Sequence, residues 1–340
     1  MLLGGEWPFA GRGSRCLTGG YPGPVQDGTA VERVKGRRPF CADLSRTRGE
    51  PLGATASRID HWLLVEYRGA WRRDILGGSL LSPRLKAHLR EHLELLRPAR
   101  LLFVKQPERR AASGRRVLLA STTPGAERLL GLEVEHQDDL RDVDLAGALA
   151  HGEAPFEPVA DPVLVVCTHG KRDRCCARYG GPLYDALRAA APPGEVWQST
   201  HVGGDRFAGN VVALPQGTFH GRVDPGDVPA LLRALAKRRV DLDRYRGRSA
   251  YPFAVQAAER ALRETEGLLG LDDLVLLGSE RSGDDAWRVR FRTPDGATHR
   301  LDVVAELGEP ELLTCEAAQP RHVRRFGVAA HRTTRARLRP

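Results

Sequence analysis

Residues 163–180 read VLVVCTHGKRDRCCARYG, and residues 200–210 read THVGGDRFAGN. The first stretch is an apolar run that ends on Cys167 and is followed by the neighbouring cysteines Cys175 and Cys176. The second is a glycine-containing loop that carries His201 and Asp205. Thiols, imidazoles and carboxylates are the groups that bind zinc and iron in proteins. The two stretches therefore predict a metal centre, with the rest of the chain as its scaffold.

The elements around this centre follow a regular order. Apolar runs and helical spacing predict a strand, a helix, a second strand, a hairpin and a closing helix, at residues 163–167, 181–191, 195–199, 210–222 and 227–236. The same order occurs earlier, with a strand, a helix, three strands and a helix at residues 62–67, 82–96, 100–105, 116–121, 129–134 and 141–150. Two pseudo-repeated thioredoxin-like units are expected, and only the second contains the bunched cysteines.

The order of the elements also predicts where the site lies. A strand, a crossover helix and a second strand give a right-handed parallel pair, and the following hairpin adds antiparallel strands. Sites in such sheets are built on the loops that leave the carboxyl ends of the parallel strands. Cys167 ends one such strand and His201 follows the next. The two loops are therefore expected to lie side by side.

The predicted fold class is α/β, with a thioredoxin-like mixed sheet, two pseudo-repeated units and a small C-terminal α+β domain. The N-terminal segment is rich in Gly, Pro and Arg and has no periodicity, which is typical of disorder. The expected parts are a disordered extension, a degenerate thioredoxin-like domain, a thioredoxin-like ferredoxin domain, a small α+β domain and a basic tail, at residues 1–40, 41–158, 159–240, 241–330 and 331–340.

Composition narrows the class of protein. The chain has 340 residues, of which 41% are hydrophobic and 28% charged, as in a soluble globular protein. It contains no apolar run long enough to span a membrane and no convincing signal peptide, so a cytoplasmic location without membrane attachment is expected. The formal net charge of +9 comes from arginines spread along the chain rather than from a basic stripe. Nucleic-acid binding is therefore not expected.

The six cysteines are too few and too unevenly placed for a disulfide framework. Cys16, Cys41 and Cys315 are scattered, and each is interpreted as a small core residue. The bunched cysteines instead indicate metal or redox chemistry.

The predicted ligands fall into two pairs. Cys167 and Cys176 lie on opposite sides of a flexible turn, and can converge on one metal. His201 and Asp205 are separated by Gly203 and a second glycine, which let the backbone fold tightly so that both side chains point one way. Two loops that each give two ligands suit a binuclear iron–sulfur cluster, and they also suit a tetrahedral zinc ion.

Three segments of the chain resemble the sucrase/ferredoxin-like family, whose members are thioredoxin-like 2Fe–2S ferredoxins. They are CTHGKRDRCC, HVGGDRFAGN and P-x-G-x-x-x-G-R, at residues 167–176, 201–210 and 215–222, and weaker similarity extends over residues 41–330. The resemblance implies a 2Fe–2S cluster, electron transfer and an unidentified redox partner protein. It implies an electron carrier rather than a catalyst with its own substrate, and no sugar hydrolysis.

The resemblance assigns three ligands and leaves the fourth open. In better-known relatives the second loop reads H-x-x-x-H, and two cysteines and two histidines hold the cluster. Cys167, Cys176 and His201 match these positions, whereas Asp205 replaces the second histidine. Either Asp205 is the fourth ligand, or Cys175 replaces it. Asp205 is preferred because neighbouring side chains of an extended loop point in opposite directions, so Cys175 would face away from Cys176.

Two other functions fit the same residues. A thioredoxin-fold thiol redox enzyme would use the cysteines directly, but the site lacks a Cys-x-x-Cys motif, and a disulfide between Cys175 and Cys176 would be strained. A zinc-binding module would use the same ligands without electron transfer.

Overall fold

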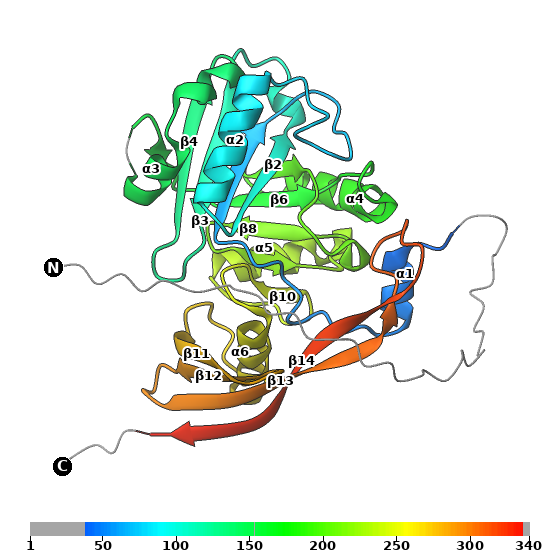
Figure 1. Ribbon diagram of the computed structural model, residues 1–340, viewed down its shortest axis with the longest axis vertical. Coiled ribbons are helices and arrows are strands. Elements are labelled where there is room, and N and C mark those ends of the chain that lie inside the picture. Colours follow the sequence, from blue (N-terminus) through cyan, green and yellow to red (C-terminus); the bar gives the residue numbers. More distant parts are fainter. Residues whose placement is uncertain (1–37, 153, 336–340) are drawn as a thin grey trace, which may run out of the picture. The chain divides into compact units, whose positions relative to one another are not determined.

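The fold is described from a computed structural model, which covers residues 38–152 and 154–335 (Figure 1). Residues 1–37 of the predicted N-terminal extension lie outside this range, and so does Cys16. No helix among the described residues is long and apolar enough to cross a membrane.

The first half of the fold pairs a parallel and an antiparallel set of strands. Strand β1 runs parallel to β2 and antiparallel to β3, which in turn pairs antiparallel with β4. Helix α2 begins where the sequence predicts, because the hydroxyl of Ser82 accepts the backbone N–H of Leu85 at 3.2 Å and Pro83 occupies the first helical position. The elements are β1 (His61–Glu66), α2 (Pro83–Leu95), β2 (Ala99–Lys105), η1 (Pro107–Arg109), β3 (Arg115–Ser121), β4 (Arg128–Val134), η2 (Gln137–Asp142), α3 (Leu145–His151) and β5 (Glu157–Pro158).

The second half repeats this pairing scheme. Strand β6 runs parallel to β7 and antiparallel to β8, and β8 pairs antiparallel with β9. The elements are β6 (Val163–Cys167), α4 (Arg174–Ala190), β7 (Val196–Ser199), η3 (Asp205–Phe207), β8 (Val211–Leu214), β9 (Thr218–His220), η4 (Pro225–Asp227), α5 (Val228–Ala236) and β10 (Tyr245–Arg248).

A short antiparallel contact between β2 and β7 joins the halves into one ten-stranded mixed sheet. The strands of the first half run nearly upright in Figure 1, whereas β6 and β8 run across the view. Residues on the inner sides of both halves form one shared apolar cluster, which includes Leu64 and Leu102 of the first half and Val165 and Val212 of the second. The predicted mixed α/β class is therefore confirmed, and the site lies against a core that both halves build.

The C-terminal part, predicted as a small α+β domain, is an antiparallel sheet with one helix, and its last strand was not expected. Helix α6 (Phe253–Glu266) packs on a four-stranded sheet of β11 (Val275–Gly283), β12 (Ala286–Arg292), β13 (Thr298–Glu311) and β14 (Arg321–Thr334). The sequence analysis did not predict β14. The segment 331–340, predicted as a basic tail, therefore starts inside a strand, and residues 336–340 lie outside the described range.

Two helices near the predicted site differ from the sequence prediction. Helix α4 was predicted from residue 181, but it begins at Arg174, because the Asp173 carboxylate accepts the backbone N–H of Cys175 at 2.8 Å and caps the helix. The predicted extended loop around Cys175 is therefore the first turn of a helix. A short helix, α1 (Cys41–Thr47), was not predicted.

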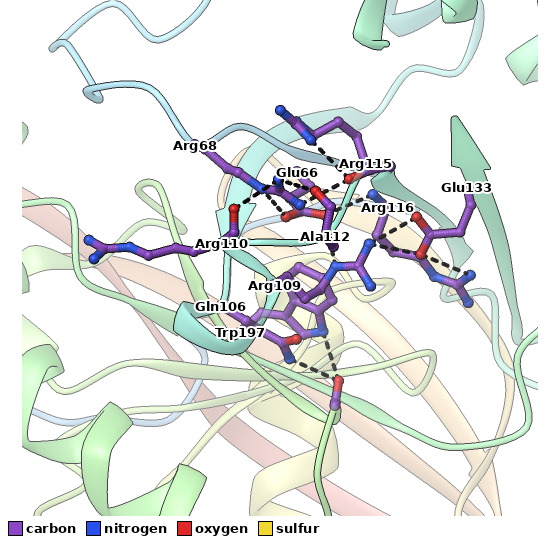
Figure 2. Close-up of polar contacts among 12 residues, drawn as sticks. Glu66, Arg68, Gln106, Arg109, Arg110, Ala112, Arg115, Arg116, Glu133 and Trp197 are labelled. Carbon is purple, nitrogen blue, oxygen red and sulfur yellow. Dashed lines mark hydrogen bonds and ion pairs between the residues drawn. The ribbon is translucent and has the colours of Figure 1, made fainter. Parts of the chain in front are cut away.

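Some of the arginine excess is used inside the fold. Glu66 ends β1 with no exposed side-chain surface, and it accepts bonds from Arg68 at 2.8 Å, from Arg109 at 2.9 Å and from the backbone N–H of Arg116 at 2.9 Å. Arg109 also pairs with Glu133 (Figure 2). Although burial opposes ionisation, these bonds lower the pKa of Glu66. The network fixes the ends of β1, β3 and β4 to one another.

Candidate metal centre

Cys167 and Cys176 come together as predicted. Cys167 is the last residue of β6, and Cys176 lies in the first turn of α4. Their sulfurs lie 3.9 and 3.7 Å from Nδ1 of His201, and these three ligand atoms all lie within 4.8 Å of one another. Each of the two cysteines is 1% exposed. A strand end and a helix start thus place two thiols beside one imidazole.

Asp205 joins the same group through His201. Its Oδ1 lies 2.9 Å from Nδ1 of His201 and accepts the Cys176 thiol at 3.4 Å. Asp205 is 3% exposed, whereas the side chain of His201 is 20% exposed and is the most accessible of the four. The structure therefore brings together all four residues that the sequence analysis preferred as ligands.

The loop from His201 to Asn210 depends on two glycines with positive φ. Gly203 has a φ of +104° and Gly204 a φ of +81°. A Cβ atom at Gly204 would stand 2.3 Å from a guanidinium nitrogen of Arg246. Only glycine allows both this conformation and this close approach, so the expected tight fold of the loop is present.

Arg246 fixes the loop from His201 to Asn210 through hydrogen bonds. Its guanidinium is buried and donates to the carbonyl of Gly203 at 3.0 Å, to Oδ1 of Asn210 at 2.8 Å and to Thr55. Burial lowers the pKa of Arg246 to about 9. Since one side chain binds both ends of the loop, it fixes the separation of those ends and so the position of His201 and Asp205.

The two thiols and the imidazole shift one another's pKa values. Hydrogen bonds from Cys176 and His201 lower the pKa of the Cys167 thiol despite its burial, while the same contact with Cys167 raises that of Cys176. Burial opposes protonation of His201, but its bonds to Asp205 and Cys167 outweigh that effect and raise its pKa to about 9. The site thus favours a thiolate at Cys167, the form that binds metals.

Cys175 lies apart from this group. Its sulfur is 3.5 Å from that of Cys41 and 3.3 Å from that of Cys315. Successive residues of a helix are turned by about 100° from one another, so Cys175 and Cys176 face different sides of α4. The sequence analysis expected the two to diverge, but in an extended loop rather than in a helical turn.

Cys41 and Cys315 are the residues that sequence reasoning missed. Both are buried, as expected of small core residues, and both contact the sulfur of Cys175 in addition to a few apolar neighbours. Cys41 and Cys315 are separated by 274 positions, so no local spacing could have grouped them. The available signal was the Cys175–Cys176 pair itself. Two neighbouring thiols on a helix face different sides, so Cys175 lies away from the site of Cys176 and can contact other residues.

The donor set fits a thiophilic metal. A tetrahedral ion with a metal–sulfur distance of about 2.3 Å and a metal–nitrogen distance of about 2.0 Å places the two ligand atoms about 3.5 Å apart, slightly less than the 3.7 and 3.9 Å that separate His201 from the two sulfurs. A binuclear cluster spreads its two ligand pairs further apart. It would require His201 and Asp205 to move away from the cysteines.

Comparisons with known proteins agree with the motifs. The sucrase/ferredoxin-like family model matches residues 52–247. "Altered inheritance of mitochondria protein 32" of Meyerozyma guilliermondii is 34% identical over 101 residues, which are 27% of this chain and 36% of that protein. The protein with the same name in Eremothecium gossypii is 28% identical over 116 residues, 30% of this chain and 36% of that protein.

The chain thus spans little more than a third of the curated relatives it matches. No solved structure gives a significant match. The family match extends from the loop after α1 to β10 and includes every residue of the candidate centre. This chain belongs to the sucrase/ferredoxin-like family.

Proposed function

We propose that this protein is an electron carrier that holds one 2Fe–2S cluster through Cys167, Cys176, His201 and Asp205. The observation that supports it most is the convergence of Cys167, Cys176 and His201 within 4.8 Å, with Asp205 bonded to His201 and Cys176, at the ends of the parallel strands β6 and β7. A bound cluster would take up and release one electron at a time. The thioredoxin-like character of the two halves is part of this proposal.

The chain's own residues would set the properties of the carrier. Three of the four donors are nearly inaccessible, whereas His201 keeps a partly exposed side chain. The imidazole is therefore the side of the site through which a redox partner protein or a proton would approach. A histidine ligand also raises the potential relative to an all-thiolate cluster. Arg246 keeps both ends of the second loop in place while the charge of the site changes.

Asp205, rather than Cys175, is proposed as the fourth ligand. Asp205 contacts both His201 and Cys176, while the sulfur of Cys175 is directed to Cys41 and Cys315. To reach the cluster, Cys175 would have to turn around the axis of α4 and leave the capped first turn. A carboxylate is a harder ligand than a thiolate and favours the ferric state.

A zinc-binding module is the second candidate, and a specific observation favours it. The distances from His201 Nδ1 to the two sulfurs suit a single ion, and the 2.9 Å hydrogen-bond distance to Asp205 would have to open to about 3.3 Å for the carboxylate to join them. A thiol redox enzyme has less support. Cys167 and Cys176 are buried beside a histidine and a carboxylate, and no exposed thiol is present among the described residues.

Anaerobic purification with analysis of iron, sulfide and zinc separates these functions. A brown protein with about two irons and two sulfides per chain, and a paramagnetic signal on reduction, is expected. Cys167→Ser should abolish the colour. Asp205→Ala should lose the cluster, and Cys175→Ala should keep it. A colourless protein whose zinc is lost in Cys167→Ser would overturn the proposal in favour of the zinc module.

The expected cytoplasmic location stays a prediction within this proposal. The printed name of the two curated relatives refers to the inheritance of mitochondria. Fractionation of cells that express the tagged full chain, followed by immunoblotting, tests the location directly. Recovery in an organelle fraction would contradict the prediction.

A further inference from the structure

A second group of thiols lies on the other side of helix α4. It consists of Cys41 at the start of α1, Cys175 in the first turn of α4 and Cys315 in the connection between β13 and β14. The sulfur of Cys41 is 3.5 Å from that of Cys175 and 3.7 Å from that of Cys315, and the sulfurs of Cys175 and Cys315 are 3.3 Å apart. All three residues are buried.

A carboxylate completes the group. Asp173 is 1% exposed, and its two oxygens accept the backbone N–H groups of Cys175 at 2.8 Å and of Cys315 at 2.6 Å. Oδ1 also lies 4.0 Å from the Cys41 sulfur. One ligand atom from each of the four residues lies within 4.8 Å of all the others. The carboxylate is thus fixed in place by the same segments that carry the thiols.

Apolar packing contributes little to the contact between α1, the start of α4 and the β13–β14 connection. The buried cluster around the three cysteines adds only the small side chains of Ala42 and Ala208, with Phe40 and Tyr179 at its edge. Burial stabilises roughly in proportion to apolar area, so two alanines contribute little. Ion pairs such as Arg46–Asp224 and Arg48–Glu311 also hold α1 to its neighbours. They do not involve the three thiols, which lie together at one buried point without a large apolar core around them.

We propose that Cys41, Cys175, Cys315 and Asp173 bind one zinc ion, which fastens α1 and the β13–β14 connection to the start of α4. With zinc–sulfur distances of about 2.3 Å, the ligands of a tetrahedral zinc lie about 3.8 Å apart, and the three measured sulfur separations approach this value. A disulfide would use two of the thiols and leave the third without a role.

Zinc binding at this site involves proton release and no change of oxidation state. Zinc has no redox change of its own, and each thiol that becomes a ligand releases its proton to solvent. The four donors come from the protein and are buried, so the site has no open position for a substrate. These are the properties of a structural site rather than a catalytic one.

The inference is independent of the proposed cluster, because it uses none of the cluster's ligands. The two sites nevertheless share the first turn of α4, where Cys175 faces one and Cys176 the other. Zinc at the second site would therefore fix the helical turn that presents Cys176 to the first.

Metal analysis of the full chain tests the inference. Protein purified under reducing conditions from zinc-supplied cells is expected to contain about one zinc per chain beside any iron. Cys315→Ser should lose this zinc and keep the iron, whereas Cys167→Ser should lose the iron and keep the zinc. If the first site also binds zinc, the wild type has two ions and each variant loses one, which defeats the electron-carrier proposal alone. Zinc that is absent from the wild type, or that is unaffected by Cys315→Ser, would overturn the second site.

Cobalt provides a test that does not need a folded Cys315 variant. The Cys167→Ser chain, loaded with Co²⁺, should show the thiolate charge-transfer and tetrahedral absorption bands of a cysteine-rich site. Failure of these bands to appear would overturn the inference. A disulfide between Cys175 and Cys315, found by intact mass and peptide mapping of protein purified under reducing conditions, would overturn it as well.

Discussion

A Cβ atom placed on Gly180 would stand 2.0 Å from the carbonyl oxygen of Cys167. Helix α4 therefore passes close to the end of β6, and the contact is between backbones, which cannot shift cheaply. This approach sets the distance between Cys167 on the strand and Cys176 on the helix.

We expect Gly180→Ala to push α4 away from β6. The free energy of unfolding should fall by roughly 2 to 4 kcal/mol, the range of an overpacked core site or worse, and metal bound by Cys167 and Cys176 should be lost with it. Urea unfolding and metal analysis measure both effects.

Gly181→Ala is the matched control, because a Cβ atom there meets nothing within 4 Å. It should leave the protein unchanged or stabilise it by up to about 1 kcal/mol, as alanine is the better helix former. Equal behaviour of the two variants would contradict the close contact.

How far the sequence could predict this region depended on the kind of signal. Strands such as β6 were predicted because their apolar runs are bounded by polar loops. The start of α4 was missed because Gly180, Gly181 and Pro182 resemble a helix boundary, while Asp173 acts as the cap seven residues earlier. Strand β14 was missed because basic residues and glycine interrupt its partly buried pattern.

The candidate site was predicted better than the fold around it. Cys167, Cys176, His201 and Asp205 lie within two short stretches, so local spacing and the parallel pairing of two strands were enough to bring them together. Cys41 and Cys315 belong to a group that only tertiary structure assembles, and a single sequence holds no distance information for such residues.

We expect Arg246→Lys to loosen the loop that carries His201 and Asp205. A lysine cannot replace the forked guanidinium that binds Gly203, Asn210 and Thr55 together. The buried acceptors left without donors should reduce the free energy of unfolding by roughly 2 to 4 kcal/mol. Urea unfolding and the amount of retained metal are the readouts.

The control for that variant is Arg238→Lys, whose exposed ion pair with Asp272 lies on the surface. Its effect should stay below about 1 kcal/mol. A loss in Arg238→Lys as large as that in Arg246→Lys would show that arginine content, rather than the loop contact, matters.

We expect Glu66→Gln to destabilise the first half of the sheet by roughly 3 kcal/mol, since Arg68 and Arg109 would lose their buried carboxylate (Figure 2). The folded pKa of Glu66 is lowered. Its stabilisation is therefore fully present above the unfolded pKa, and it is lost as the pH falls from there through the folded pKa. Urea unfolding at neutral and acidic pH measures both.

Glu94→Gln removes an exposed partner of Arg97 and serves as the comparison. It should change stability by less than about 1 kcal/mol at either pH. If Glu66→Gln were equally mild at neutral pH, the network of Figure 2 would have no energetic importance.

We expect His220 to make the protein less stable in acid. Burial lowers its folded pKa to about 4, whereas an unfolded histidine titrates near about 6.5. Between these values the unfolded chain binds a proton that the folded chain excludes, so stability falls as the pH falls. Between pH 7 and pH 5 this one residue should account for about 2 kcal/mol.

His220→Gln should remove that part of the pH dependence, even if it costs some stability at neutral pH. The comparison is the difference in unfolding free energy between the two pH values, measured for each protein in the same metal state. Identical differences in the wild type and the variant would mean that His220 does not exclude its proton in the folded state.

During synthesis of the chain, the residues of the two thiol groups become available at different times. Cys167, Cys176, His201 and Asp205 all leave the ribosome within one short interval, so this group is complete on a growing chain. Cys41 is synthesised early, but its partner Cys315 follows 274 residues later. The group beside Asp173 is therefore completed last, and a chain truncated before Cys315 contains every donor of the first group but lacks one donor of the second.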